Sequence, residues 1–148
     1  METKKIDRTG WAAGPWDNEG DEEKWVDEAT GYQCLMLRNS MGAWCGYVAV
    51  PKDHPLHGKS YDDAHGAAAI NVHGGLTFDG ERAEPGQWFL GFDCNHYRDR
   101  APGLESLLVN IRNGVNGPGL GDDFDVYRTA AYVRDECTNL ARQLKEAA

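Results

Sequence analysis

The chain has 148 residues, of which 41% are apolar, and it carries a formal net charge of −9. This length is typical of one domain, and the apolar fraction is enough for a hydrophobic core, which excludes a largely disordered chain. The acidic charge repels phosphate backbones and anionic membrane surfaces, so neither long nucleic acid nor a membrane is an expected partner.

No apolar run is long enough for a signal peptide or a membrane-spanning helix, which predicts a cytoplasmic protein. Without a secretion signal we expect free thiols in a reducing cytosol rather than disulfides. The cysteines are widely spaced and form no CxxC pair: Cys34, Cys45, Cys94 and Cys137.

The first half of the chain predicts an arm, a strand pair and a loop. Residues 1–30 combine tryptophans with acidic residues, and we expect an arm whose indoles pack on the domain while its carboxylates stay in water. Residues 32–38 (YQCLMLR) and 43–50 (AWCGYVAV) predict two strands joined by a turn. Prolines and glycines interrupt residues 51–66, which predicts a long polar loop, functional or disordered.

The second half predicts two further strands. Residues 67–78 (AAAINVHGGLTF) predict a third strand, which a hairpin loop at 79–87 joins to a fourth at 88–95 (WFLGFDCN). The fourth strand is almost wholly apolar and is therefore expected to be central. Residues 100–124 predict a loop with at most one helical turn, at 104–111.

Residues 125–147 predict a long helix. Its apolar stripe recurs at steps of three and four: Val126, Ala130, Val133, Cys137, Leu140 and Leu144. Carboxylates favour a helix N-terminus, where this chain has Asp122, Asp123 and Asp125. The sequence thus predicts one α+β domain over residues 1–148, a mostly antiparallel sheet of four to five strands with the helix packed on one face. Strand 32–38 would be an exposed edge, which allows a homodimer.

The histidines concentrate in one stretch, since all five lie between positions 54 and 96. If the third and fourth strands pair, His73 lies close to Asp93, although a one-residue slip would exchange the faces. A carboxylate holds a histidine in one tautomer and suits it to act as a general base, and a second histidine can serve as general acid. The candidate catalytic residues are therefore His73, His96 and Asp93, with Thr77 to position a phosphoryl oxygen.

Substrate binding is predicted for the residues around these histidines. A cation with backbone N–H groups could stabilise a developing oxyanion, the polar loop could close over an anionic ligand, and an aromatic side chain could stack on a ring. The candidate binding residues are Trp44, Tyr47, His54, His57, Lys59, Tyr61, Gly74, Gly75 and Arg98.

Plainer structural interpretations remain open for several of these residues. His73 could be a half-buried residue hydrogen-bonded to Asp93, and Gly74-Gly75 could be a bulge or a close approach of the backbone. A carboxylate in an apolar strand, as at Asp93, is costly unless it is paired or functional. Cys94 is expected to be a small buried apolar residue rather than a nucleophile, because acidic neighbours raise its pKa.

No metal or other cofactor is expected. His54 and His57, with Asp62, Asp63 or His65, could hold a metal ion, but their spacing matches no standard zinc pattern. No phosphate-binding glycine motif of the common nucleotide-binding folds is present either.

The segments GPWDNEGDEEKWVDEATGYQCLMLRN, MGAWCGYVAVPKDHPLHGKSYDD, VHGGLTF and GFDCNHY resemble a family of small uncharacterised proteins of tailed bacteriophages and their bacterial hosts. The resemblance runs from Gly14 to about Asp99 and includes the C-terminal segment YRTAAYVRDECTNLARQL. It implies a small, cytosolic accessory protein and transfers no catalytic residue. Small accessory phage proteins often act against host defences, some of them by cleaving or sequestering nucleotide immune signals.

Three hypotheses follow. The first is a metal-independent phosphodiesterase that cleaves a cyclic nucleotide immune signal. The second is a non-catalytic protein that sequesters a small nucleotide or ADP-ribose-type signal, which the aromatic residues Trp44, Tyr47, Tyr61, Trp88 and Tyr97 favour. The third is a protein-binding inhibitor whose acidic N-terminal third acts as a decoy for a basic surface.

Overall fold

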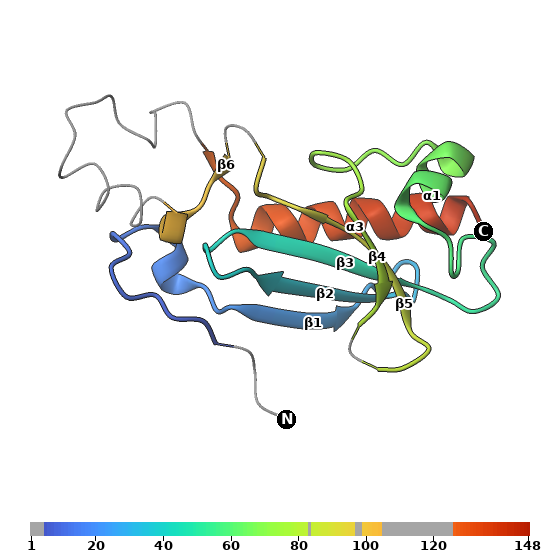
Figure 1. Ribbon diagram of the computed structural model, residues 1–148. Coiled ribbons are helices and arrows are strands. Elements are labelled where there is room, and N and C mark those ends of the chain that lie inside the picture. The colour runs from blue at the N-terminus through green and yellow to red at the C-terminus, as the bar shows by residue number, and fades with distance from the viewer. Residues whose placement is uncertain (1–4, 83, 97–98, 105–125) are drawn as a thin grey trace.

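A computed structural model describes residues 5–82, 84–96, 99–104 and 126–148. A five-stranded antiparallel sheet packs against a C-terminal helix, which confirms the predicted α+β class (Figure 1). The strand order is β1-β2-β3-β5-β4, with bounds Glu22–Val26 (β1), Gln33–Arg38 (β2), Trp44–Val50 (β3), Phe78–Glu81 (β4) and Trp88–Asp93 (β5). The remaining elements are a short 3-10 helix (Pro15–Asn18), α1 (Tyr61–Ala68), a parallel pair of β6 (Asp99–Arg100) and β7 (Val126–Tyr127), and α3 (Ala130–Glu146).

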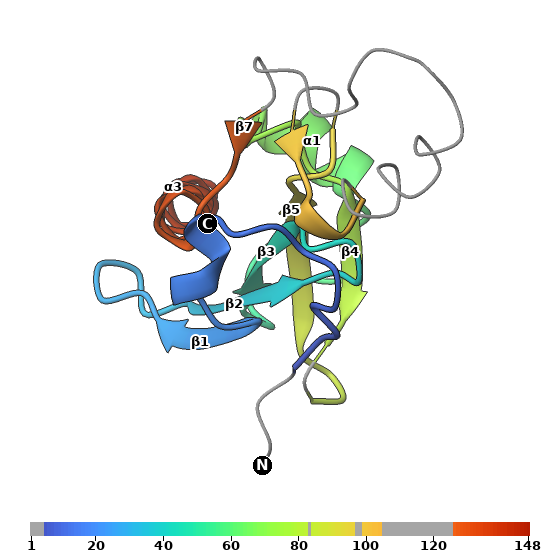
Figure 2. The ribbon, with the colours of Figure 1, turned by 90° about the vertical axis from the view of Figure 1, so that its left-hand side faces the viewer.

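Helix α3 covers one face of the sheet, as the view along the helix shows (Figure 2). Its buried side chains are Ala130, Val133, Cys137, Leu140, Ala141 and Leu144. These include the predicted stripe except Val126, which lies in β7 and is 46% exposed. The helix begins later than predicted because Thr129 caps it and accepts a hydrogen bond from the Tyr132 N–H. The three aspartates expected to precede the helix lie outside the described residues.

The N-terminal arm differs from the prediction because part of it joins the sheet and the core. Strand β1 pairs with β2, so the predicted edge strand lies inside the sheet, between β1 and β3. Two acidic residues of the arm are held by arginines rather than by water. We call this group the Arg38 cluster: Arg8, Glu19, Asp21 and Arg38.

Arg38 explains why the arm folds back. Its guanidinium is fully buried, and a buried charge is tolerated only when it is paired and hydrogen-bonded. Its Nε donates to Asp21 at 3.0 Å and its terminal nitrogen to Glu19 at 3.2 Å. The other carboxylate oxygen of Glu19 accepts the Ala130 N–H at 2.7 Å, which ties the arm to the first turn of α3. The expectation that the arm's carboxylates stay in water is therefore wrong for these two residues.

The predicted third strand is wrong over most of its length. Helix α1 begins inside the expected loop at 51–66, because Ser60 caps it and accepts the Asp63 N–H, and two aspartates occupy its first turn. Only Phe78 of the expected strand at 67–78 belongs to β4. The hairpin pairs Phe78 with Gly91, so His73 lies outside the sheet.

Tight packing between the sheet and α3 depends on one glycine of β3. A Cβ atom at Gly46 would meet the ring of Phe92 at 2.5 Å and the sulfur of Cys137 at 2.8 Å. No helix within the described ranges is long and apolar enough to cross a membrane.

Candidate functional site

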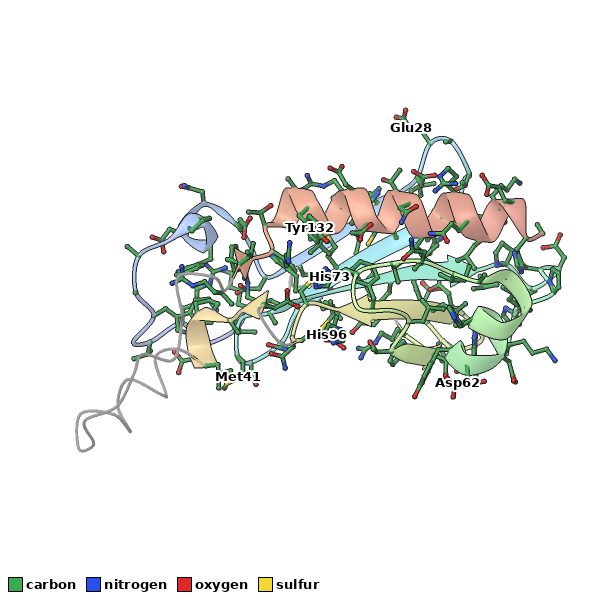
Figure 3. All side chains as sticks on the ribbon, turned by 90° about the horizontal axis from the view of Figure 1, so that it is seen from above. Glu28, Met41, Asp62, His73, His96 and Tyr132 are labelled. Atoms are coloured by element: carbon green, nitrogen blue, oxygen red, sulfur yellow. The ribbon has the colours of Figure 1, made fainter. Side chains whose placement is uncertain are left out.

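Two histidine–aspartate pairs lie together at the end of the sheet where β5 ends (Figure 3). Nε2 of His73 lies 2.8 Å from Oδ2 of Asp99, and Nε2 of His96 lies 3.3 Å from Oδ1 of Asp93. The two imidazole centroids are 5.9 Å apart. His73 was predicted to lie close to Asp93, and this prediction is wrong. The segment before Phe78 lies outside the sheet, and His73 pairs with Asp99 instead.

Asp99 is the most buried of the charged groups here, with a side chain only 2% exposed. It accepts hydrogen bonds from the ring of His73, from the His96 backbone N–H at 3.1 Å and from Nε of Arg128 at 3.1 Å. Burial alone would raise the pKa of the Asp99 carboxyl, but these hydrogen bonds outweigh it and lower the pKa below its ordinary value. The β6–β7 pair holds Asp99 beside the strand that leads into Arg128.

His73 uses both ring nitrogens inside the protein. Nδ1 lies 2.9 Å from the Tyr132 hydroxyl, and the two rings meet edge to face at 5.5 Å. The backbone N–H of His73 donates to Glu136 at 3.0 Å, one helical turn beyond Tyr132. Two side chains of α3 therefore fix both the ring and the backbone of His73.

His96 is the more accessible histidine, with 34% of its side chain exposed. Its ring lies directly over Gly74, where a Cβ atom would come within 2.2 Å of Nε2. The contact of Nε2 with Asp93 is too poorly aligned for a hydrogen bond, so this nitrogen is buried without a hydrogen-bond partner among the described residues. Asp93 is itself oriented by Thr77, whose hydroxyl donates to it at 2.8 Å.

We call this group the histidine site: His73, His96, Asp93, Asp99, Arg128 and Tyr132. Sequence reasoning missed its last three members. Asp99 could have been found, because it follows His96 by three residues in a polar segment. Tyr132 and Arg128 carry no local signal, since the predicted helix was interpreted through its apolar stripe alone.

Several predicted binding residues are unavailable to a ligand at this site. Trp44 is fully buried and Tyr47 is 5% exposed, so neither ring can stack on a ligand. The N–H of Gly75 donates to the Val72 carbonyl and cannot contribute to an oxyanion hole. Gly74 serves instead as the close backbone approach under His96.

The predicted lid histidines bind the chain itself. His54 is buried, accepts the Leu56 N–H at Nδ1 and so donates from Nε2 to the Leu144 carbonyl at 2.6 Å. Nδ1 of His57 donates to the Val50 carbonyl at 2.8 Å. These bonds hold the 51–60 segment on the end of α3 and on β3, which is a structural role.

Lys59 and Tyr61 lie toward the far end of β5 from the histidine site. The Lys59 carbonyl accepts a hydrogen bond from Trp88, the first residue of β5, and the strand from there to Asp93 spans about 17 Å. Tyr61 is 37% exposed. Arg98 lies outside the described residues.

Cys94 lies next to the histidine site but is buried. Burial, and after it the Asp99 carboxylate, raise the pKa of the Cys94 thiol well above its ordinary value. A thiol that resists ionisation is a poor nucleophile, so the chemistry of this site depends on imidazole, carboxylate and phenol groups.

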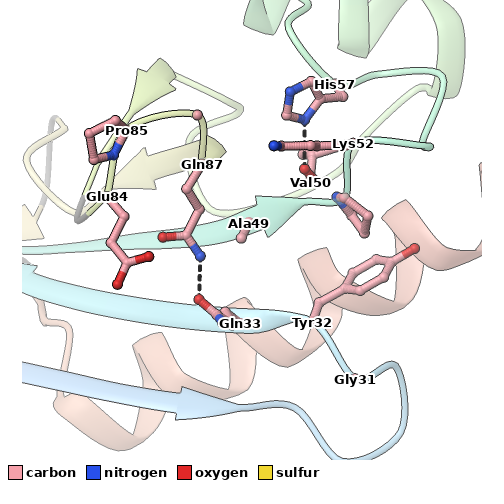
Figure 4. A pocket seen from close by; sticks show the side chains of 12 residues that line it. Gly31, Tyr32, Gln33, Ala49, Val50, Lys52, His57, Glu84, Pro85 and Gln87 are labelled. Carbon is pink, nitrogen blue, oxygen red and sulfur yellow. Dashed lines mark hydrogen bonds between the residues drawn. The ribbon is translucent and has the colours of Figure 1, made fainter.

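A cavity of about 390 Å³ lies at the opposite end of β3, next to Val50 (Figure 4). Its walls include Tyr32, Lys52 and His57, and the Gln87 amide donates across it to Gln33. No member of the histidine site lines this cavity.

The fold and the site together define a small α+β protein with two histidine–aspartate pairs at one end of its sheet. Comparison of the chain with protein-family models, curated proteins and solved structures gave no significant match. A fold class does not determine a function, so the proposal below depends on the chemistry of the histidine site.

Proposed function

We propose that this chain is a metal-independent phosphodiesterase that uses His73 and His96 as an acid–base pair. One observation carries the proposal: the centroids of two imidazoles lie 5.9 Å apart, each ring beside its own carboxylate, and the His96–Asp93 pair is more exposed than the His73–Asp99 pair. Two titratable groups in contrasting environments are the arrangement by which enzymes separate an acid from a base.

His96 suits the role of general base. It is the more exposed of the two rings, and the carboxylate of Asp93 beside Nε2 favours the tautomer with its proton on that nitrogen. Nδ1 would then accept the proton of an attacking hydroxyl or water. Thr77 donates its hydroxyl proton to Asp93, so we assign it to orienting that carboxylate rather than to holding a phosphoryl oxygen.

His73 suits the role of general acid. Asp99 offers an ionised partner to Nε2, and a protonated ring would carry the transferable proton on the Nδ1 side. Arg128 takes the cationic role expected of Lys59 or Arg98. Among the described residues only its Nε forms a hydrogen bond, which leaves the terminal N–H groups for a phosphoryl oxygen.

A cyclic nucleotide immune signal is the substrate class that we propose, in the context of phage counter-defence. The cationic Arg128 beside the two histidines supports an anionic substrate, and the counter-defence context is proposed from the sequence motifs alone. The chain as a whole is acidic and repels anions, so the positive charge of Arg128 would have to attract the substrate locally.

The test is incubation of the purified protein with a panel of cyclic dinucleotides, with and without chelator, followed by mass spectrometry. We expect product in the presence of chelator, and a loss of about 10²–10⁴-fold in turnover for His73→Ala and for His96→Ala. His65→Ala is the matched control, because His65 is an exposed histidine of α1 bonded to the Ile70 carbonyl. The proposal fails if the wild-type protein cleaves nothing or if both site variants retain full turnover.

Sequestration without cleavage is the second candidate, and the cavity beside Val50 favours it. Lys52 could hold an anionic group there, although the buried Trp44 and Tyr47 cannot stack on a ligand. Recovery of intact nucleotide from the heat-denatured protein, unaffected by His73→Ala, would support this function.

The third hypothesis is an acidic decoy for a basic protein, and fewer carboxylates of the arm are available for it than the sequence suggested. Glu19 and Asp21 bind buried or half-buried arginines and are not free to face a partner. A decoy would have to depend on the remaining carboxylates of the arm.

A further inference from the structure

Tyr132 belongs to the same chain of hydrogen bonds as His73 and Asp99. Asp99 occupies Nε2 of His73, and the Tyr132 hydroxyl occupies Nδ1 at 2.9 Å. His73 therefore cannot present either ring nitrogen to a ligand unless Tyr132 moves away. The Tyr132 hydroxyl ends this chain of hydrogen bonds among the described residues, and the Tyr132 residue is half-buried.

We infer that Tyr132 is a further catalytic residue, which passes a proton from His73 to the leaving-group oxygen of the phosphodiester. This inference rests on the proposed hydrolytic function and assigns the direct contact with the leaving group to Tyr132 instead of His73.

The proton balance follows from the two states of the His73 ring. Asp99 keeps a proton on Nε2 in both states, so the neutral ring accepts the Tyr132 proton at Nδ1. In the protonated ring, Nδ1–H donates to the tyrosine oxygen, and the tyrosine O–H is free to point outward. The attacking water or hydroxyl gives its proton to His96, and its oxygen forms the new P–O bond. As the P–O bond to the leaving group breaks, the leaving oxygen takes the tyrosine proton and tyrosine takes the Nδ1 proton. The products are a phosphate ester, an alcohol, an unchanged tyrosine, a neutral His73 and a protonated His96; exchange with solvent restores the two histidines.

The surroundings of Tyr132 favour a relay over a free tyrosinate. Burial raises the pKa of the Tyr132 hydroxyl, and the Glu136 carboxylate on the same helix adds to this effect. The Arg128 guanidinium lies 5.0 Å above the ring and acts in the opposite direction. Cys94 and Asp99 face the same group. Because the ionised form is disfavoured, the two proton transfers must occur together.

The inference is tested with Tyr132→Phe, which removes only the hydroxyl, and two forms of one substrate. One is the cyclic dinucleotide with the highest turnover in the panel, and the other carries sulfur in place of the leaving-group oxygen. A thiolate leaves without general-acid help, because a thiol is a much stronger acid than an alcohol. Tyr127→Phe is the control, because it removes a tyrosine hydroxyl that bonds to Arg38 and Glu19 outside the histidine site.

We expect Tyr132→Phe to lower kcat for the oxygen substrate by about 10²-fold or more and to leave the sulfur substrate near the wild-type rate. His96→Ala should impair both substrates, since the base is needed for either leaving group. Equal loss on both substrates, or no loss on either, would overturn the role of Tyr132 while leaving the hydrolase intact. A wild-type protein that cleaves neither substrate would overturn the proposed function, and this inference with it.

Discussion

The Arg38 cluster and the histidine site both concentrate charged side chains, but the two regions differ in how completely those side chains are hydrogen-bonded. In the Arg38 cluster, the fully buried guanidinium donates to two carboxylates, the Tyr127 hydroxyl and the carbonyls of Gly20 and Gly42. In the histidine site, by contrast, a ring nitrogen of His96 is buried without a hydrogen-bond partner among the described residues.

The difference separates two uses of buried charge. In the Arg38 cluster every guanidinium nitrogen of Arg38 donates within the protein, so none is available to a ligand, and these bonds hold the arm to the sheet. The histidine site leaves the His96 ring about a third exposed, and the terminal nitrogens of Arg128 form no hydrogen bond among the described residues, so it can accept a further partner. Both regions concentrate charge, so charge alone does not distinguish them. The hydrogen bonds do, because they saturate the guanidinium of Arg38 but not the groups of the histidine site.

The largest expected effect on stability comes from Arg38→Ala. It leaves Glu19 and Asp21 in the interior without their cation, which should cost about 3–5 kcal/mol in the free energy of unfolding. Urea titration followed by tryptophan fluorescence measures it, and turnover per folded molecule should not change. If the variant does not fold, Arg38→Lys keeps the charge but loses the planar fork and should give an intermediate loss. A loss below about 1 kcal/mol would mean that the cluster is not structural.

Asp99→Asn should have a smaller effect, about 1–3 kcal/mol, because it weakens hydrogen bonds to His73 and Arg128. The pKa of Asp99 is lowered in the folded protein, so the carboxylate stabilises the fold above its unfolded pKa of about 3.9. That contribution is lost as the pH falls through the lowered pKa. The gap in unfolding free energy between the wild type and the variant should therefore be widest near neutral pH and shrink in acid. A gap independent of pH would contradict the ionised state assigned to Asp99.

Gly74→Ala tests the backbone approach under His96. Gly74 has φ +67°, a left-handed conformation that costs a residue with a Cβ about 1–2 kcal/mol. The new methyl would also overlap the His96 ring, so we expect turnover to fall more than stability does. Gly58→Ala is the matched control, since Gly58 has φ +78° and open space around it. Equal turnover in the two variants would show that the position of His96 is not critical.

Thr77→Val should have the smallest effect on stability, about 0.5 kcal/mol or less, because the hydrogen bond it removes is exposed. The expected change is a modest fall in kcat, since Asp93 would lose one of the groups that orient it. Steady-state kinetics would show it, and a large rise in KM with unchanged kcat would instead favour a direct contact between Thr77 and the substrate.

The sequence by itself determined the elements whose signals are local. The apolar runs of β2, β3 and β5 and the stripe of α3 can be recognised without any partner, because burial imposes a period of two or of 3.6 on neighbouring residues. These elements were enough to predict the α+β class and the helix across the sheet.

Only the tertiary structure decided which groups meet. His73 was assigned to a strand beside Asp93, but the backbone N–H groups of Asn71 and His73 donate to side chains of α3, and the ring lies beside Asp99 and Tyr132. The burial of Glu19 and Asp21 in the acidic arm was likewise not predicted, because it depends on their ion pairs with Arg38, which lies in another segment of the chain. Hydrogen bonds and ion pairs between distant segments leave no periodic trace in a sequence, so they emerge only when the sheet and the helix are assembled.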